Sequence, residues 1–328
     1  MIVKRIGALA AVGAALLAVA LSAVQPAAAQ SFPTKPIRWI VRTGPGAVVD
    51  TMMRAAAAEM EKTLGQPAVI ENRAGGGGAV GVGAAAKAAS DGYTLVLGFP
   101  SSMVTLPMMQ KDLPYDPWKE LESVSLLFNA SFYLSTRAGS GFNSLKDVID
   151  AAKARPGQVT IGHGAIGGMP HLGVELLREV AGVEFNQVFY KGDAALVTDF
   201  LGGRLDLVSA NVAAFSAQVK EGSVRMLFQF GERRSQALVA IPTIAEQGYP
   251  KVVAASWVGV SAPAGTPSAV LNRLSAAITA AMVTPAVRER LTQFGLDGVG
   301  STPQAYAEFL RGERDKWGPI VRRLNLKL

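Results

Sequence analysis

The chain has 328 residues, no cysteine and a formal net charge of +7, from 32 basic and 25 acidic side chains. The lack of cysteine excludes disulfides, thiolate metal sites and thiol nucleophiles. The basic residues are scattered instead of forming a stripe with interleaved aromatic residues, so no nucleic-acid partner is expected.

The N-terminus predicts a secretory signal peptide. Lys4 and Arg5 precede an apolar run over residues 6–24, and three alanines at positions 27–29 offer the small residues of a cleavage site. We therefore expect residues 1–29 to be removed on export to the periplasm. A membrane anchor is the alternative, because the run is long for a signal. No later segment reaches the ~20 uninterrupted apolar residues that span a bilayer.

Strand and helix patterns alternate through most of the remaining chain. Strands are expected at 37–41, 68–71, 93–98, 124–128, 132–135, 160–162, 188–190, 205–209, 224–230 and 256–260. Helices are expected at 50–64, 80–89, 145–154, 171–181 and 194–201, and after Pro267 at 268–282, 285–294 and 303–324. Strands separated by helices predict an α/β fold with parallel sheets that carry helices on both faces.

The sequence also predicts two lobes. A strand, a Gly-rich turn and a helix follow one another near residues 37–64 and again near 160–181. Each turn follows the carboxyl end of its strand, where open α/β sheets bind ligands, and the chain is longer than one core usually holds. We expect lobe 1 to comprise residues 30–128 plus 255–328, lobe 2 to comprise 129–254, and the ligand to lie in the cleft between them.

A run of glycines invites a cofactor interpretation. Residues 76–81 match the dinucleotide pattern G-x-G-x-x-G between an expected strand and helix. No acidic residue follows about 20 positions later to hold a ribose, and four consecutive glycines satisfy the pattern cheaply. We expect no cofactor. The favoured interpretation is a loop whose amides face the cleft, and a merely flexible loop is the alternative.

Residues suited to catalysis are few. The only histidines are His163 and His171, neither of which lies in a hydrolase or metalloprotease motif. Their spacing, with Pro170 between them, is poor for a shared metal, so no metal site and no catalytic residue are expected. An exported hydrolase is a less favoured alternative, for which Ser101 and His163 would be the nucleophile and base.

The order of short motifs along the mature chain resembles the periplasmic solute receptors of tripartite tricarboxylate transporters, the Bug or TctC-like receptors. The motifs are Ile37-Arg38-Trp39-Ile40-Val41 before Pro45-Gly46 and Asp50, Leu64-Gly65-Gln66-Pro67, Glu71-Asn72-Arg73, Asp91-Gly92-Tyr93-Thr94-Leu95, Leu113-Pro114-Tyr115-Asp116-Pro117, Ala154-Arg155-Pro156-Gly157, His171-Leu172, Tyr190-Lys191-Gly192, Leu201-Gly202-Gly203, Leu205-Asp206-Leu207, Ile241-Pro242-Thr243, Ser256-Trp257 and Ala262-Pro263-Ala264-Gly265-Thr266-Pro267.

The resemblance implies a two-lobed, type II-like periplasmic binding protein that performs no chemistry. It implies capture of a small carboxylate by a monomer and its delivery to the membrane permease of a tripartite tricarboxylate transporter. A receptor that senses the same acid for a membrane signalling protein is the alternative. The implied ligand-binding residues are Gly46, Ala47, Val48, Asp50, Ser101, Ser102, His163, Gly164, Ala165, Gly167, Gly168, Met169, His171 and Asn211.

The chain departs from the family pattern at several of these positions. Where the family commonly has Pro-Gly-Gly-Ser/Thr-x-Asp, this chain has Ala47 and Val48 in place of the second glycine and the hydroxyl residue. His163 and Pro170 replace hydroxyl residues, and an alanine replaces the acid before Asn211. These changes favour an aromatic or branched carboxylate over citrate or an amino acid. The residues expected to line its apolar side are Val48, Phe99, Met103, Ile166 and Met169.

Overall fold

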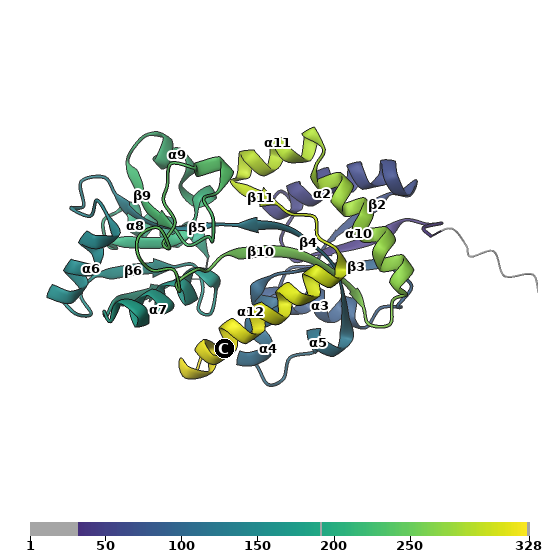
Figure 1. Cartoon of the computed structure of the whole chain (residues 1–328), viewed down its shortest axis with the longest axis horizontal. Helices are drawn as coiled ribbons and strands as arrows, with labels where there is room; N and C mark the ends of the chain where they lie inside the picture. The colour runs from purple at the N-terminus through teal and green to yellow at the C-terminus, as the bar shows by residue number, and fades with distance from the viewer. Residues whose placement is uncertain (1–31, 191, 327–328) are drawn as a thin grey trace, which may run out of the picture. The chain divides into compact units, whose positions relative to one another are not determined.

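The computed structural model describes residues 32–190 and 192–326 (Figure 1). The predicted signal peptide, residues 1–29, lies outside the described residues. All helices and strands described below belong to one compact unit of the chain, which begins at Pro36.

The first lobe is built on a six-stranded sheet with the order β11-β4-β10-β3-β1-β2. Its strands are β1 (Ile37–Val41), β2 (Ala68–Asn72), β3 (Thr94–Gly98), β4 (Leu121–Ala130), β10 (Ser256–Pro263) and β11 (Leu296–Gly298). β1 pairs in parallel with β2 and β3, whereas β10 pairs antiparallel with β3 and β4, and β11 antiparallel with β4.

The second lobe is built on a five-stranded sheet with the order β7-β6-β8-β5-β9. Its strands are β5 (Phe132–Arg137), β6 (Thr160–His163), β7 (Asn186–Phe189), β8 (Leu207–Asn211) and β9 (Val224–Gln229). β6 pairs in parallel with β7 and β8, and β5 pairs antiparallel with β8 and β9.

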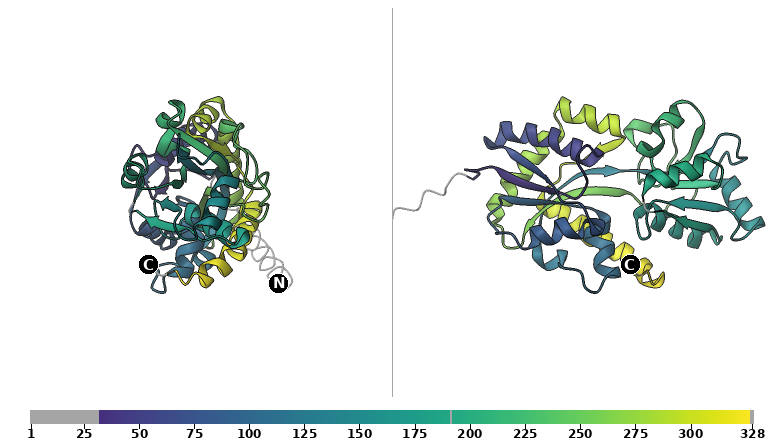
Figure 2. Two further views of the ribbon diagram at one scale, coloured as in Figure 1. Left: turned by 90° about the vertical axis from the view of Figure 1, so that its left-hand side faces the viewer. Right: turned by 180° about the vertical axis from the view of Figure 1, so that it is seen from behind.

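Both sheets are therefore mixed: the predicted parallel pairing holds for β1, β2 and β3 and for β6, β7 and β8, and is wrong for β4, β5, β9, β10 and β11. The chain leaves the first sheet through β4, continues directly into β5 after Ser131, and returns from the second sheet through β10 (Figures 1 and 2). Parallel neighbours need a crossover connection, usually a helix, between consecutive strands. No helix separates β4 from β5, so the chain passes straight from one sheet into the other. The predicted two-lobed α/β fold, with sheets flanked by helices, is confirmed.

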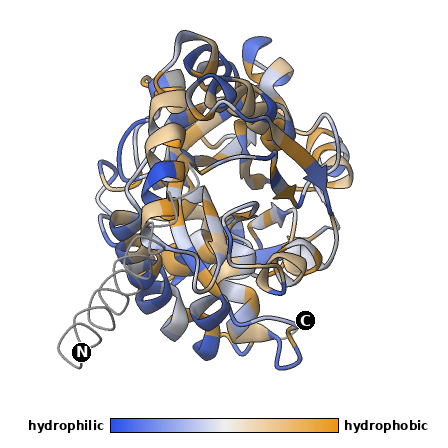
Figure 3. Ribbon diagram, turned by 90° about the vertical axis from the view of Figure 1, so that its right-hand side faces the viewer, coloured by the Kyte–Doolittle hydropathy of each residue, from blue (hydrophilic) through white to orange (hydrophobic). Residues whose placement is uncertain are grey.

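The longer helices match the predicted segments closely. They are α2 (Val48–Leu64), α3 (Ala79–Ala86), α6 (Leu145–Ala154), α7 (Met169–Ala181), α8 (Asp193–Leu201), α10 (Ser268–Met282), α11 (Pro285–Phe294) and α12 (Pro303–Arg323). Helices on the surface carry both hydrophilic and hydrophobic residues, as expected for helices that cover sheets (Figure 3), whereas α3 consists only of alanine, valine and glycine. Several short elements were not predicted, among them a π-helix (Ser101–Thr105), α4 (Leu106–Met109), α5 (Pro117–Glu120) and α9 (Ser216–Lys220).

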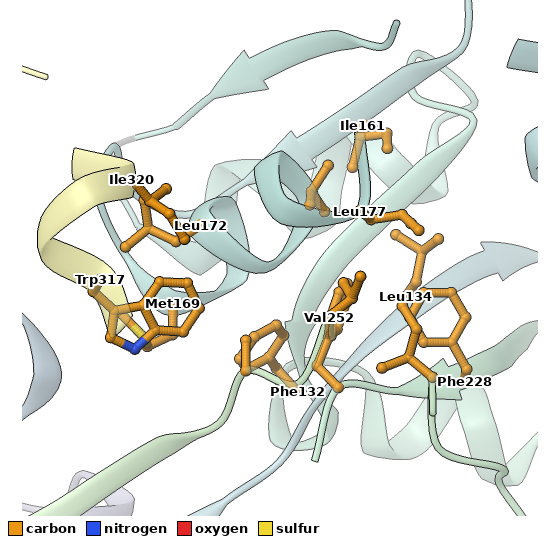
Figure 4. Close-up of a cluster of buried hydrophobic side chains, with 14 of the residues drawn as sticks. Phe132, Leu134, Ile161, Met169, Leu172, Leu177, Phe228, Val252, Trp317 and Ile320 are labelled. Carbon is orange, nitrogen blue, oxygen red and sulfur yellow. The ribbon is translucent and has the colours of Figure 1, made fainter. Parts of the chain in front are cut away.

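The last helix contributes to the core of both lobes. Trp317 and Ile320 of α12 belong to one buried cluster with Met169 and Leu172 of α7 (Figure 4). The rest of this cluster includes side chains of both sheets, such as Leu126 and Phe132. Apolar packing of α12 therefore joins the C-terminal segment to the second lobe as well as the first.

Among the described residues, no single helix has the length and apolar composition needed to cross a membrane. Helices α10 and α11 satisfy that criterion only when taken together, and they are bent by 71° at the break between them.

Candidate functional site

The first candidate turn connects β1 to α2 and is held by a buried carboxylate. Asp50, 2% exposed, accepts a 2.9 Å hydrogen bond from the amide of Gly46 and a 2.8 Å bond from Asn72 Nδ2. Arg54 donates to both carboxylate oxygens of Asp50, at 3.1 Å each. Burial disfavours the charged carboxylate, but the bonds from Arg54, Asn72 and Gly46 prevail and lower the pKa of Asp50 to about 2. This network ties the turn to α2 and β2.

The backbone of this turn accommodates Ala47, which stands where the family commonly has a glycine. Gly46 has φ of +80°, a conformation that favours glycine, whereas Ala47 has φ of −64° and needs no glycine. Ala47 is the N-cap of α2 and provides no side-chain cap. In the described part of the chain, the amides of Val48 and Val49 have no acceptor, as is usual for the first turn of an uncapped helix. The turn therefore presents free N–H groups at the positive end of a helix dipole.

Arg42, which sequence reasoning missed, lies directly after β1 at the same edge of the sheet. Its Nη1 donates a 2.8 Å hydrogen bond to the carbonyl of Gly77, and its guanidinium lies 3.9 Å from the centroid of the Phe99 ring. Burial lowers the pKa of Arg42 to about 10, which leaves it charged at neutral pH. The available signal was a basic residue immediately after an apolar strand.

Ser101 and Ser102 follow β3 and have different surroundings. The Ser101 hydroxyl donates a 3.2 Å hydrogen bond to the carbonyl of Gly77, which also accepts from Arg42. Ser102 is fully buried, and its Oγ accepts a 3.2 Å bond from the Phe99 amide. Ser101 therefore belongs to the edge where the loops after β1, β2 and β3 meet, whereas Ser102 stabilises the turn after β3.

The second candidate turn connects β6 to α7. Ala165 and Ile166 are exposed, and the Gly167 amide donates a 3.0 Å hydrogen bond to Nδ1 of His171. Gly168 is the N-cap of α7 and, like Ala47, offers no side-chain cap. In the described residues the amide of Met169 has no acceptor. Gly164 accepts a 3.0 Å bond from the Gly192 amide, so this turn is tied to the loop after β7.

His163 is the last residue of β6, not part of the turn, and its side chain is completely buried. Its ring stacks on Phe189 with centroids 5.5 Å apart and lies edge-on to His171 at the same separation. Burial, reinforced by His171 and opposed by the side chain of Gln187, lowers the pKa of His163 to about 3. Both ring nitrogens are buried and have no hydrogen-bond partner among the described residues. The histidine is neutral and enclosed between β6 and α7.

Asn211 ends β8, beside the strand through which the chain enters the second sheet. Its Nδ2 donates a 3.2 Å hydrogen bond to the carbonyl of Ser131, between β4 and β5. The nearby Ser209 hydroxyl donates a 3.0 Å bond to the carbonyl of Pro170. These bonds attach the end of β8 to the crossing point and to the first turn of α7.

The two lobes approach each other at the second turn. A side chain placed on Gly167, which has φ of +72°, would lie 2.8 Å from Cε of Met109 in α4. Phe99, Met103 and Met169, predicted to line the ligand's apolar side, are all at most 5% exposed, and only Val48 and Ile166 of that set present substantial surface.

Ser101 and His163, the nucleophile and base of the hydrolase alternative, do not contact each other. Ser101 donates to Gly77, while His163 is occupied by ring packing. No group of three or more His, Asp or Glu side chains suited to a metal ion occurs within the described residues. A separate cavity of about 880 Å³ is lined by residues such as Asn129, Arg233, Trp257 and Lys316, and none of the predicted site residues in the described part of the chain lines it.

Comparison with known proteins identifies the family. Residues 52–326 match the family described as tripartite tricarboxylate transporter family receptor. BugT of Bordetella pertussis is 36% identical over 304 residues, covering 92% of this chain and 93% of its own length. An R. palustris protein solved with adipate is 30% identical with a TM-score of 0.77, covering 89% of this chain and 97% of its own. MatC from Rhodopseudomonas palustris, solved with bound malate, is 27% identical with a TM-score of 0.73, covering 88% of this chain and 100% of its own.

These matches extend over nearly the whole described chain and agree with the two-lobed fold, which is that of periplasmic binding proteins. The chain belongs to the receptor family of the tripartite tricarboxylate transporters.

Proposed function

We propose that this protein captures a small carboxylate in the periplasm, between the turn after β1 and the turn after β6, and delivers it to a tripartite tricarboxylate-type permease. The protein acts as a monomer and leaves its ligand chemically unchanged. The observation that carries this proposal is the position of two uncapped helices. Helices α2 and α7 both begin just after the carboxyl end of a parallel strand, and the amides of Val48, Val49 and Met169 in their first turns have no acceptor among the described residues.

The physical argument rests on unpaired donors. A helix N-terminus carries a partial positive charge and several N–H groups that the helix itself leaves unpaired. Most natural helices satisfy these groups with a Ser, Thr, Asp or Asn cap, and neither Ala47 nor Gly168 provides one. A carboxylate supplies the missing acceptors from both lobes at once, which favours the closed arrangement of a binding protein. The adipate and malate in the two R. palustris relatives support this class of ligand.

The residues of the site then divide into two groups. Ala47, Val48, Ser101, Gly164, Ala165, Gly168 and Met169 contact the ligand, mainly through their backbone amides. Asp50, Ser102, His163, Gly167, His171 and Asn211 hold the turns in place by packing or hydrogen bonds. Gly46 belongs to this second group, because its amide already donates to Asp50. The half-buried Val48 and the exposed Ile166 supply the apolar contacts for an aromatic or branched acid.

A thermal-shift screen of the chain from residue 30 tests the function. Adipate, malate, citrate and benzoate are the probes, because a ligand that binds only the folded state raises the melting temperature with the logarithm of its concentration. We expect at least one monocarboxylate or dicarboxylate to do so. A flat response to every acid would contradict the proposal.

A proline substitution tests the amide contact itself. Val48 is the first residue of α2, a position that tolerates proline, and the preceding Ala47 has the extended backbone that proline requires. Val48→Pro removes one N–H donor, so we expect calorimetry to give a dissociation constant about ten- to a hundredfold higher, as for loss of a charge-assisted hydrogen bond. Ser268→Pro at the first position of α10, also after an extended residue, is the matched control and should bind as the wild type does. Equal affinity for Val48→Pro would show that this amide makes no contact.

A further inference from the structure

Arg42 is a cation without an ionic partner among the described residues. Several other arginines pair with carboxylates, for example Arg38 with Glu71, Arg54 with Asp50 and Arg178 with Glu175. Arg42 forms no ion pair with any described residue, and the acceptor of its hydrogen bond is the neutral carbonyl of Gly77. Its Nε is buried and has no hydrogen-bond partner in the described chain. A partly buried guanidinium whose Nε has no acceptor is costly unless an anion completes it.

The surrounding residues hold this guanidinium in one place. The Phe99 ring lies 3.9 Å from it, which fixes its plane by a cation–π contact. Gly78, with φ of +106°, leaves room for the Arg42 stem, because a Cβ there would lie 2.8 Å from Arg42 Cδ. The Gly77 carbonyl accepts from both Arg42 and the Ser101 hydroxyl. The side chain is thus preorganised by loops after β1, β2 and β3, which lowers the cost of binding an anion.

A second unsatisfied group lies next to it. The Thr43 hydroxyl is buried and has no partner among the described residues, although the carbonyl of Thr43 accepts a 2.8 Å bond from Asn72. Two adjacent residues at the carboxyl end of β1 therefore carry polar atoms that nothing in the described chain satisfies. Such orphan atoms are rare in folded proteins and call for a specific partner.

We propose that Arg42 is the charged anchor of the binding site and forms an ion pair with an ionised carboxylate of the ligand. This inference rests on the proposed function, and it adds that the ligand is selected as an anion and not only as a hydrogen-bond acceptor. A fork of N–H groups facing a carboxylate is the geometry in which arginine binds most strongly. The receptor then prefers fully ionised acids over the corresponding amides or esters.

Isothermal titration calorimetry with adipate and malate, at low and high salt, tests the assignment on three variants. Arg42→Met keeps the apolar stem against Phe99 and removes the charge, Arg42→Lys keeps the charge, and Arg38→Met removes an equal charge near the opposite, N-terminal end of β1. Arg38 already has partners, since it contacts Glu71 and Thr94 at 3.4 and 3.2 Å. It is therefore the matched control for net charge.

We expect Arg42→Met to weaken binding about ten- to a hundredfold, to reduce the salt dependence of the dissociation constant, and to be partly rescued by Arg42→Lys. Arg38→Met should change the affinity less than about fivefold. Unfolding curves for each variant establish that it is folded. If Arg42→Met weakens binding without changing its salt dependence, Arg42 only positions the loops and the assignment is overturned. If Arg42→Met binds with wild-type affinity, the role assigned to Arg42 is overturned but the proposed function is not. If the wild-type chain binds no carboxylate, the proposed function is overturned as well.

Discussion

Nδ1 of His171 accepts a 3.0 Å hydrogen bond from the amide of Gly167, so the first turn of α7 holds the loop that precedes it. Because Nδ1 accepts, the neutral ring carries its proton on Nε2, and burial lowers the pKa of His171 in keeping with a neutral ring. The same ring packs edge-on against Phe189 at 4.8 Å. One buried side chain thereby links the turn, the helix and β7.

Replacement of His171 by phenylalanine separates these two roles. The ring contact with Phe189 is retained, but the buried Gly167 amide loses its acceptor. We expect the free energy of unfolding to fall by about 1 to 3 kcal/mol, measured by urea denaturation. A His171→Phe variant as stable as the wild type would mean that water or a backbone group replaces the imidazole.

The buried His163 predicts a specific pH dependence of stability. Its pKa is about 3 in the folded protein and near 6.5 when unfolded, so only the unfolded chain takes up a proton between these values. The contribution of the neutral ring is complete above about pH 6.5 and is lost as the pH falls toward 3, by about 1.4 kcal/mol per pH unit. In urea titrations at several pH values, His163→Leu should lose less stability than the wild type between about pH 6 and 5. Parallel losses in the two proteins would indicate that His163 titrates normally.

Loss of the Asp50 charge should destabilise the first turn. Asp50→Asn keeps the size of the side chain but weakens the bonds from Arg54 and Gly46, so we expect a loss of about 2 kcal/mol in the free energy of unfolding at neutral pH. Asp150→Asn is the control, because Asp150 pairs with Lys146 on the surface of α6 and should cost less than about 1 kcal/mol. Urea denaturation of both variants measures the difference, and similar values for the two would contradict the structural role of Asp50.

The docking of α12 on the second lobe depends on packing more than on charge. Trp317 is fully buried in the shared cluster, so Trp317→Ala should cost about 3 to 5 kcal/mol in unfolding free energy. Arg323 pairs with Glu179 of α7, but both side chains are about half exposed, so Arg323→Ala should cost less than about 1 kcal/mol. Thermal or urea unfolding ranks the two variants. A larger loss of unfolding free energy for Arg323→Ala than for Trp317→Ala would contradict the prediction that packing dominates.

Sequence reasoning was most accurate where a local signal marks an element's end. Helix α6 begins after Ser144, which forms a reciprocal capping box with Asp147, and its bounds agree with the predicted 145–154. Helix α11 begins at Pro285, a residue suited to the first helical position. By contrast, α2 and α7 each begin two residues before the predicted start, because neither has a side-chain cap to mark it.

In the candidate site, too, sequence reasoning succeeded where the signal was local and failed where it was not. The turn after β1 and the turn after β6 were predicted from glycines that follow apolar strands, and each does precede a helix. The burial of His163 was not predictable, because its enclosure depends on Phe189 in the neighbouring strand. Arg42 was overlooked for the same reason, because its contacts are with Gly77 and Phe99, which are distant in sequence.

The sequence by itself determined the order and type of the principal strands and helices, because hydrophobic periodicity, prolines and capping residues act within a few positions of each other. Tertiary structure alone decided the mixed direction of both sheets, the enclosure of His163 and the separation of Arg42 from the carboxylates of the described chain. Strand pairing and burial join residues that are far apart in the chain, so they follow from the free energy of the whole packed arrangement and leave no local pattern.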